Sequence, residues 1–104
     1  MKEDIYASSN YELATALGAR LRDYRKRSGF TRKALAERSG VSEFTIGAFE
    51  RGENPGLSLQ SLLALMRALE VLEQTEALLP ALPVSPQEIF EREQSKRKKR
   101  KQQQ

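Results

Sequence analysis

A run of six cations near the carboxyl terminus is the densest group of charged side chains in this sequence. Residues 96–101 read Lys-Arg-Lys-Lys-Arg-Lys, and no acid interrupts them. The chain of 104 residues holds 18 Lys and Arg against 14 Asp and Glu, which gives a formal net charge of +4. Residues 1–57 hold ten cations against eight acids and residues 58–95 hold two against six, so the run accounts for the excess. Such a block is a solvated tail, an arm that contacts DNA phosphates, or a docking segment for an acidic protein.

The composition also limits the chemistry that this chain can perform. It has no Cys and no His, which removes disulfides, thiolate nucleophiles, imidazole bases and the usual zinc and iron sites. No pair of carboxylates is set in a pattern typical of a catalytic cleft. We therefore expect no metal and no cofactor, and an enzyme is the function class that the sequence favours least.

Two further features bear on where the protein resides. The amino terminus, Met-Lys-Glu-Asp-Ile-Tyr, has acids where a signal peptide has an apolar run. No stretch approaches the roughly 18 apolar residues of a membrane-spanning helix. The sequence therefore predicts a cytoplasmic protein that does not contact a membrane.

The elements that must position the charged side chains are predicted to be helices. No segment alternates apolar and polar residues as strands do, and Ser or Thr stands where each of the longer helical patterns begins. The expected helices cover residues 10–27, 31–39, 42–51, 59–69 and 72–79, and a last helix begins at Pro86. The predicted fold class is all-α.

Two of these helices have a predicted apolar face. The first has Leu13, Leu17, Leu21 and Tyr24 at i, i+4, i+8 and i+11. The fourth is expected to direct inward Leu59, Leu62, Leu63, Met66 and Leu69. Together with Val41, Ile46 and Phe49, which lie in or between the two short helices at 31–39 and 42–51, these side chains are the predicted core.

The most specific stretch of the sequence is residues 30–52. Two short predicted helices are separated there by Gly40 and Val41, where the chain must turn sharply. Gly40 permits a positive φ at the turn, and the small side chain of Ala36 lets the two helices approach. This is the spacing of a helix-turn-helix, whose second helix enters the major groove of DNA.

Several residue types recur at fixed spacing in and around this stretch. They are Leu-Gly-Ala-Arg-Leu-Arg at 17–22, Tyr-Arg at 24–25, Gly-Phe-Thr at 29–31, Leu-Ala at 35–36, Ser-Gly-Val-Ser at 39–42, Ile46, and Phe-Glu-Arg-Gly at 49–52. Over residues 13–72 the chain resembles the Cro/Xre-type phage-repressor domain. The resemblance implies a compact five-helix domain, followed here by a short carboxyl-terminal helix and the basic tail. It also implies a homodimer that binds double-stranded DNA at an inverted-repeat operator.

A first set of residues is expected to contact the DNA backbone, with Arg32 foremost. Arg32 stands where the family usually has Gln, and an arginine there can meet a phosphate with its charge; the alternative is a solvated helix start. The candidates for backbone contact are Thr31, Arg32, Lys33 and Arg51.

A second set faces the groove from the recognition helix and its cap. Its members are Ser42, Glu43, Phe44, Thr45, Gly47 and Ala48. The resemblance places Glu43, Phe44 and Ala48 where base contacts are made. Glu43 can accept from a cytosine amino group, and Phe44 or Ala48 can touch a thymine methyl group. Phe44 can instead fold back on its own helix, and Gly47 is interpreted as clearance against the DNA.

Arg25 and Glu50 are expected to have a structural role. The resemblance implies a buried ion pair between them, which ties the first helix to the end of the recognition helix. The alternative is that Arg25 contacts DNA.

Leucines after the motif have two possible roles. Leu72, Leu78, Leu79 and Leu82 are candidates for a dimer interface and equally for additional core. A twofold dimer would place two recognition helices about one DNA turn apart, ~34–36 Å.

The expected organisation has three parts: an amino-terminal arm over residues 1–9, a helix-turn-helix DNA-binding domain over 10–80, and a Pro-containing linker, short helix and basic tail over 81–104. Leu-Leu-Pro at 78–80, Pro83 and Ser-Pro at 85–86, with the basic terminus, resemble small regulators paired with HipA-like kinase toxins. This narrower resemblance implies an antitoxin that represses its own operon and contacts a HipA-like kinase or its companion subunit.

Three functions remain as hypotheses at this point. The first is a sequence-specific transcriptional repressor on the antitoxin side of a toxin–antitoxin operon. The second is a stand-alone phage or restriction-type Xre regulator. The third is a protein-interaction module whose helix-turn-helix does not bind DNA.

Overall fold

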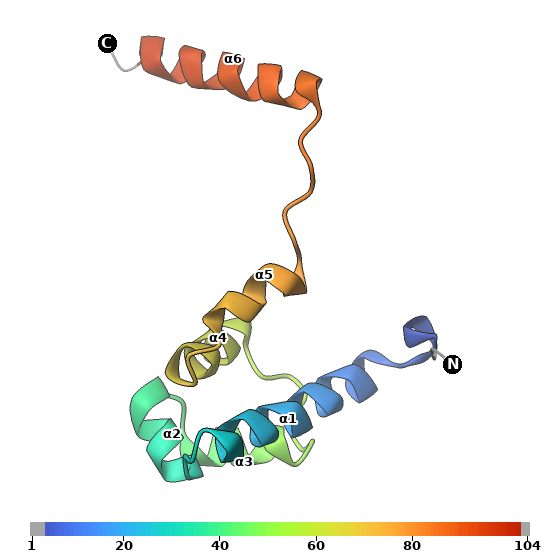
Figure 1. The fold of residues 1–104 in the computed structure, drawn as a ribbon, viewed down its shortest axis with the longest axis vertical. Coiled ribbons are helices and arrows are strands. Elements are labelled where there is room, and N and C mark those ends of the chain that lie inside the picture. The colour runs from blue at the N-terminus through green and yellow to red at the C-terminus, as the bar shows by residue number, and fades with distance from the viewer. Residues whose placement is uncertain (1–3, 103–104) are drawn as a thin grey trace. The chain divides into compact units, whose positions relative to one another are not determined.

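A computed structural model describes residues 4–102 of the chain, with side chains described for residues 4–97. The chain forms two compact units, one that ends at Gln74 and one that begins at Thr75. Every regular element in the described residues is helical, which confirms the all-α prediction (Figure 1). Among these residues, no helix has the length and apolar composition needed to cross a membrane.

The first unit contains four α-helices and two short 3-10 turns. In chain order they are η1 (Ile5–Ala7), α1 (Asn10–Arg27), α2 (Arg32–Ser39), α3 (Glu43–Glu50), α4 (Leu59–Ala68) and η2 (Leu72–Gln74). The predicted bounds of α1 to α4 hold to within one residue at each end. Local capping explains this accuracy.

The start of α1 shows the capping most fully. The Ser9 hydroxyl accepts a hydrogen bond from the Glu12 backbone N–H at 3.0 Å, and the Glu12 carboxylate accepts one from the Ser9 N–H at 3.3 Å. These two bonds satisfy backbone donors that a helix start leaves free. Thr31, Ser42 and Ser58 cap α2, α3 and α4 with the same side-chain-to-backbone bond.

The position of α1 is set by a close crossing with α3 at Gly18. A Cβ added to Gly18 would overlap the carbonyl oxygen of Phe49, so only glycine permits this approach of the two backbones. The buried residues of α1 are Gly18, Leu21 and Arg25. The predicted leucine face is therefore wrong in part: the crossing turns Leu17 and Tyr24 outward, where both are exposed.

The core of this unit lies between α2, α3 and α4. Its fully buried side chains are Leu35, Ile46 and Leu65. Along α4 the buried residues are Leu65 and Ala68, with Leu69 buried at the end of the helix, whereas Leu59 is 62% exposed. The expected inward face of this helix is thus correct for Leu62 and Leu69 and wrong for Leu59, and it missed Leu65.

The predicted helix over residues 72–79 forms as two short pieces. Glu70 adopts a positive φ of 59°, which ends the turn after α4. The chain then makes the 3-10 turn η2 in the first unit and the helix α5 (Thr75–Leu78) in the second. Pro80 lies two residues after Leu78 and cannot continue a helix, so the helical segment ends at Leu78.

The second unit consists of α5, an irregular segment and α6 (Pro86–Gln102). Ser85 and Glu88 form a capping box, with N–H···O distances of 3.2 Å to the Ser85 hydroxyl and 3.3 Å to the Glu88 carboxylate. This confirms the predicted start at Pro86. The helix continues through the basic run, of which the side chains of residues 98–101 lie outside the described residues.

The candidate interface leucines divide between the two units. Leu72 lies in η2 and is half-buried, whereas Leu78, Leu79 and Leu82 in the second unit are exposed. The last three are therefore not core in this structure.

Candidate nucleic-acid interface

The two motif helices are joined by a turn that Gly40 makes possible. Gly40 has a φ of 78°, and its N–H donates to the Ala36 carbonyl oxygen at 2.9 Å to close α2. Positive φ costs glycine little, because it has no Cβ. Ser42 then begins α3, and the fully buried Leu35 and Ile46 anchor the two helices in one core.

The amino-terminal end of α3 is the exposed part of the motif. Ser42, Glu43 and Phe44 all face solvent, and Phe44 is 80% exposed, so its ring covers little of its own helix. An exposed acid beside an exposed aromatic ring gives this end of the helix one hydrogen-bond acceptor and one apolar surface. Both are groups that can distinguish base edges in a major groove.

The cap of α3 occupies two of the predicted groove-facing hydroxyls. The Ser42 hydroxyl accepts from the Thr45 N–H at 3.0 Å, and the two side-chain oxygens lie 2.7 Å apart in a hydrogen bond. Thr45 is half-buried. These two residues orient the start of the helix.

Gly47 and Ala48 lie on the buried side of α3, which differs from the expectation that they face the groove. Ala48 is 5% exposed and belongs to the core. All of residues 46–50 are buried, because α1, α2 and the side chains of Arg32 and Arg51 together enclose this end of α3.

Two arginine side chains of the same motif lie over Gly47. A Cβ added to Gly47 would lie 2.8 Å from Nη1 of Arg51 and 3.7 Å from Cδ of Arg32. The missing side chain thus gives room to two arginines that come from different parts of the motif. The sequence interpretation of Gly47 as clearance against DNA did not include them.

The predicted pair of Arg25 and Glu50 is present and buried, and Arg32 joins it. Arg25 donates from Nε to Glu50 Oε2 at 2.7 Å and from Nη2 to Oε1 at 2.9 Å. Arg32 donates from Nε to Oε1 at 3.1 Å. A third bond, from Arg25 Nη1 to the Phe30 carbonyl oxygen at 2.8 Å, ties the pair to the start of the motif.

The electrostatics of this cluster favour the charged forms. Burial raises the pKa of Glu50, but hydrogen bonds and charge from Arg25 and Arg32 outweigh it and hold that pKa below its ordinary value. The hydrogen bond to Glu50 raises the pKa of Arg25. Since two guanidinium groups share one carboxylate, one positive charge remains, and Arg32 is its more exposed carrier.

The remaining predicted backbone contacts are accessible. Thr31 and Lys33 are exposed at the start of α2. Arg51, at the end of α3, is exposed and held by Glu53 through bonds of 3.1 Å from Nε and 3.0 Å from Nη2. Sequence reasoning missed Glu53, whose only signal is its position two residues after Arg51.

Comparisons with known proteins address the same region. A family described as a helix-turn-helix domain matches residues 16–79. The match includes all ten predicted site residues and the buried cluster of Arg25, Arg32 and Glu50. No match was found in the comparison with curated proteins or in that with solved structures.

Proposed function

The chain belongs to the helix-turn-helix domain family, and we propose on this basis that it is a sequence-specific transcriptional repressor that binds double-stranded DNA. The observation that carries the proposal is the exposed amino-terminal end of α3, where Glu43 and Phe44 both face solvent. The second helix of such a motif enters the major groove with its first residues against the base edges.

The contacts divide into those that position the protein and those that read sequence. Arg32 and Arg51 are each oriented by a carboxylate, and a guanidinium group forms strong charge-assisted hydrogen bonds with phosphate. Thr31 and Lys33 add accessible donors at the same helix start. These four residues are proposed to contact the DNA backbone.

Fewer residues are proposed to contact the bases than the DNA backbone. Glu43 is proposed to accept from a cytosine amino group, and Phe44 to contact a thymine methyl group. Ser42 and Thr45 support this end of the helix, whereas the buried Ala48 is not part of the proposed reading surface. With so few base contacts, sequence-dependent DNA shape supplies a share of the specificity.

A homodimer on an inverted-repeat operator completes this proposal. Two copies related by a twofold axis place their recognition helices in successive major grooves, about 34–36 Å apart. Such a repressor acts in the cytoplasm on the DNA of its own cell.

The direct test compares binding of the full chain to its own promoter and to shuffled DNA of the same composition. We expect preferential binding of the promoter. Glu43→Ala should remove about 1–3 kcal/mol of discrimination at one operator position and leave binding to shuffled DNA unchanged. Glu37→Ala, which removes an exposed acid from α2, is the matched control and should retain the preference.

Two results would contradict the proposal. Equal affinity of the wild-type chain for promoter and shuffled DNA would favour a protein-interaction module. An equal loss of affinity for both DNAs in Glu43→Ala would remove Glu43 from the reading surface.

We further propose that the protein acts on the antitoxin side of an operon that encodes a HipA-like kinase toxin. The support is the resemblance of residues 78–86 and the basic run to such regulators. Purification of the chain expressed from its native operon should bring down a kinase-like protein or its companion subunit, encoded by a neighbouring reading frame. A neighbourhood without a kinase-like frame would favour a stand-alone Xre regulator.

A further inference from the structure

The segment between α5 and α6 repeats a Xaa-Pro pair every three residues. The pairs are Leu79-Pro80, Leu82-Pro83 and Ser85-Pro86. A period of three is that of the polyproline II helix, which has three residues per turn and no internal hydrogen bonds. In this conformation Pro80 and Pro83 share one edge, and Leu79 and Leu82 share the next, whereas Pro86 is the first residue of α6.

The same spacing restricts the backbone before any partner binds. Each proline has its φ held near −65°, and the residue before each proline is biased to the β or polyproline II region. Within residues 79–86 only Ala81 and Val84 escape both restrictions. The segment is extended between α5 and α6 (Figure 1), and it has no helical or strand assignment from Pro80 to Ser85.

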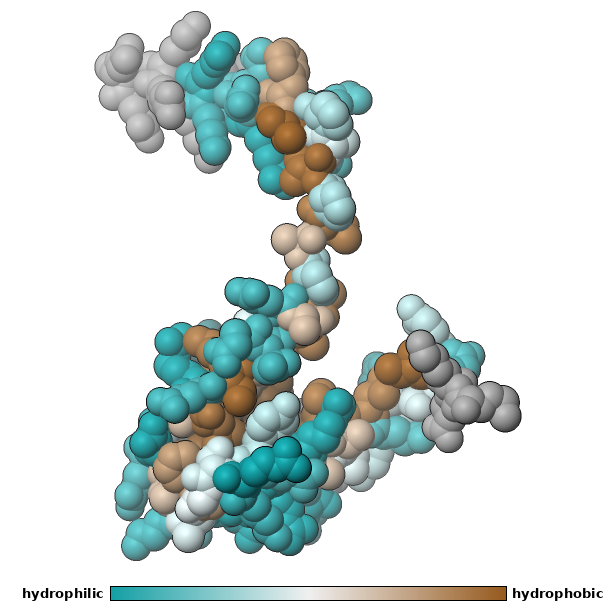
Figure 2. Space-filling view, viewed as in Figure 1, coloured by the Kyte–Doolittle hydropathy of each residue, from teal (hydrophilic) through white to brown (hydrophobic). Residues whose placement is uncertain are grey.

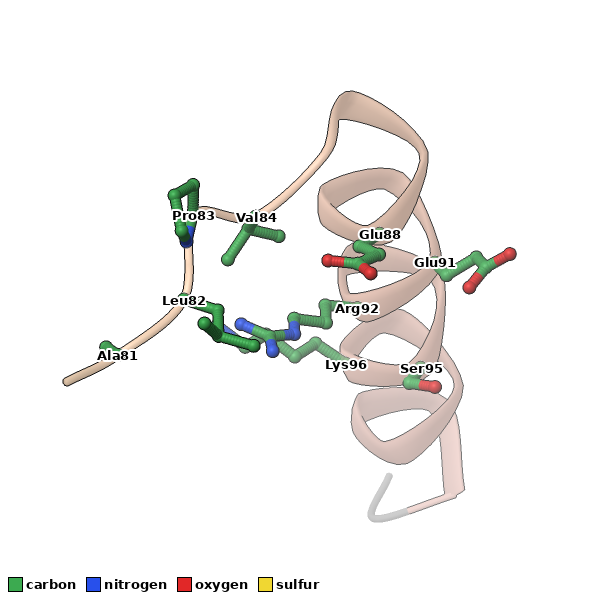
Figure 3. A pocket seen from close by; sticks show the side chains of 9 residues that line it. All are labelled: Ala81, Leu82, Pro83, Val84, Glu88, Glu91, Arg92, Ser95 and Lys96. Carbon is green, nitrogen blue, oxygen red and sulfur yellow. The ribbon is translucent and has the colours of Figure 1, made fainter. Parts of the chain in front are cut away.

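The two leucines of this segment are almost fully exposed. Leu79 is 86% and Leu82 84% exposed, and hydrophobic side chains line the segment and the first turn of α6 (Figure 2). Val84 would lie on the third edge of the polyproline II helix, and its side chain is half-buried. Leu82 and Val84 both line the hollow beside α6, and Figure 3 shows their side chains directed toward that helix.

We propose that residues 79–85 are a polyproline II recognition segment that docks in an aromatic-lined groove of a partner protein. Grooves of this kind accept Xaa-Pro pairs in slots between parallel aromatic rings. A segment that is already extended loses less conformational entropy on binding. The proposal is independent of DNA binding by α2 and α3.

Two other ligand classes fit the segment poorly. Residues 68–91 contain no Lys or Arg, so the segment has no charge with which to hold DNA phosphates. A polyproline II chain leaves its backbone polar groups without internal partners, which opposes insertion in a bilayer. An aromatic groove accepts the leucines and prolines and leaves that backbone hydrated.

The test titrates the full chain against a panel of isolated SH3 and WW domains, which present such grooves, and measures affinity by calorimetry or NMR. We expect saturable binding to at least one domain. The double variant Leu79→Ser/Leu82→Ser should weaken it by tenfold or more, since each leucine side chain loses its burial. Pro80→Ala/Pro83→Ala should also weaken it, because the backbone is no longer held extended.

Leu59→Ser is the matched control, because Leu59 is an exposed leucine of α4 outside the segment; it should bind like the wild type. Thermal melting checks that each variant is folded, which is expected because the substituted leucines are exposed. Absence of binding to every domain, or binding that the segment variants do not change, overturns the proposal. A dimer that dissociates in Leu79→Ser/Leu82→Ser, with no domain bound, assigns the segment to a second copy of the chain and overturns it equally.

Discussion

At the residue scale, the Glu50 carboxylate links the core of the helix-turn-helix unit to its proposed DNA-binding surface. It accepts from the buried Arg25 of α1 and from the more exposed Arg32 of α2. A buried carboxylate without partners would be costly, and these two cations satisfy it. The same bonds hold Arg32 at the start of α2, where a phosphate contact is proposed.

Loss of Arg25 should therefore lower stability. Arg25→Ala leaves Glu50 buried with one partner fewer, and breaking a buried pair costs about 3–5 kcal/mol. We expect a clearly lower melting temperature by circular dichroism. Arg22→Ala, at an exposed position on the same helix, should melt close to the wild type. Unchanged melting of Arg25→Ala would show that the pair contributes no stability.

The lowered pKa of Glu50 also predicts a dependence of stability on pH. Because the pKa is lower in the folded chain than in the unfolded one, where it is about 4.3, the charged carboxylate stabilises the fold above that value. This contribution is lost as the pH falls through the folded pKa. The melting temperature should fall as the pH drops below about 4.3, and Glu50→Gln should start lower and show a weaker dependence. Equal dependence in both would assign the effect to other acids.

At the element scale, glycines inside α1 and α3 decide how closely other groups approach these helices. Gly18 faces the Phe49 carbonyl oxygen of α3, and Gly47 faces the ends of Arg51 and Arg32. The neighbour of Gly18 is a backbone atom, which cannot move without moving a helix. The nearest neighbour of Gly47 is the end of a flexible side chain, Arg51. Substitution at the two positions should therefore have opposite effects on stability.

Gly18→Ala should destabilise the fold. Alanine is a better helix former by about 1 kcal/mol, but its methyl group would separate α1 from α3, and overpacking costs roughly 1–3 kcal/mol. Chemical denaturation should show a net loss. Gly56→Ala is the control, since its added Cβ would meet only the Asn54 side chain at 3.7 Å. A stability gain in Gly18→Ala would contradict the close crossing.

Gly47→Ala should separate stability from DNA binding. The Arg51 guanidinium can swing aside, so we expect the free energy of unfolding to stay constant or to rise by up to about 1 kcal/mol from helix propensity. Affinity for DNA should fall, because Arg51 and Arg32 lose their positions over this glycine. Melting and a DNA titration on the same sample test both effects. Unchanged affinity would mean that these positions do not serve DNA binding.

At the scale of the whole molecule, the charge is divided between a helix-turn-helix unit and a basic end. The six cations of residues 96–101 continue α6, which ends at Gln102. Cations in contact with phosphate release counterions and so steepen the salt dependence of binding. The contribution of this basic run to DNA binding is therefore measured by the slope of log affinity against log salt concentration.

Removal of residues 95–104 tests whether the basic run is an arm that contacts DNA phosphates. If the cations bind DNA, the slope should become shallower by about 0.9 for each phosphate that the tail neutralises, while the preference for the promoter over shuffled DNA remains. A chain of full length with residues 96–101 replaced by Ser separates charge from length and should behave like the deletion. An unchanged slope would exclude the arm and favour an acidic protein partner for this run.

Local sequence was sufficient for α1 to α4, for the start of α6 and for the family. Caps such as Ser9 with Glu12, and the turn at Gly40, depend on residues within about four positions of each other, so their bonds follow from the sequence. The spacing of residues 30–52 predicted the helix-turn-helix in the same way, and the family match confirms it. The exposed Glu43 and Phe44 follow from their place at the start of α3.

The inward faces and the partners of charged groups depended on tertiary structure. Gly18 meets Phe49, and Arg32 meets Glu50, across separations in the chain that no helical period encodes. The crossing at Gly18 left Leu17 and Tyr24 exposed. The sequence by itself thus determined which elements form and which family they compose. Only the contacts between distant residues decided which side of each helix is buried, because that side follows from the closest approach of two backbones.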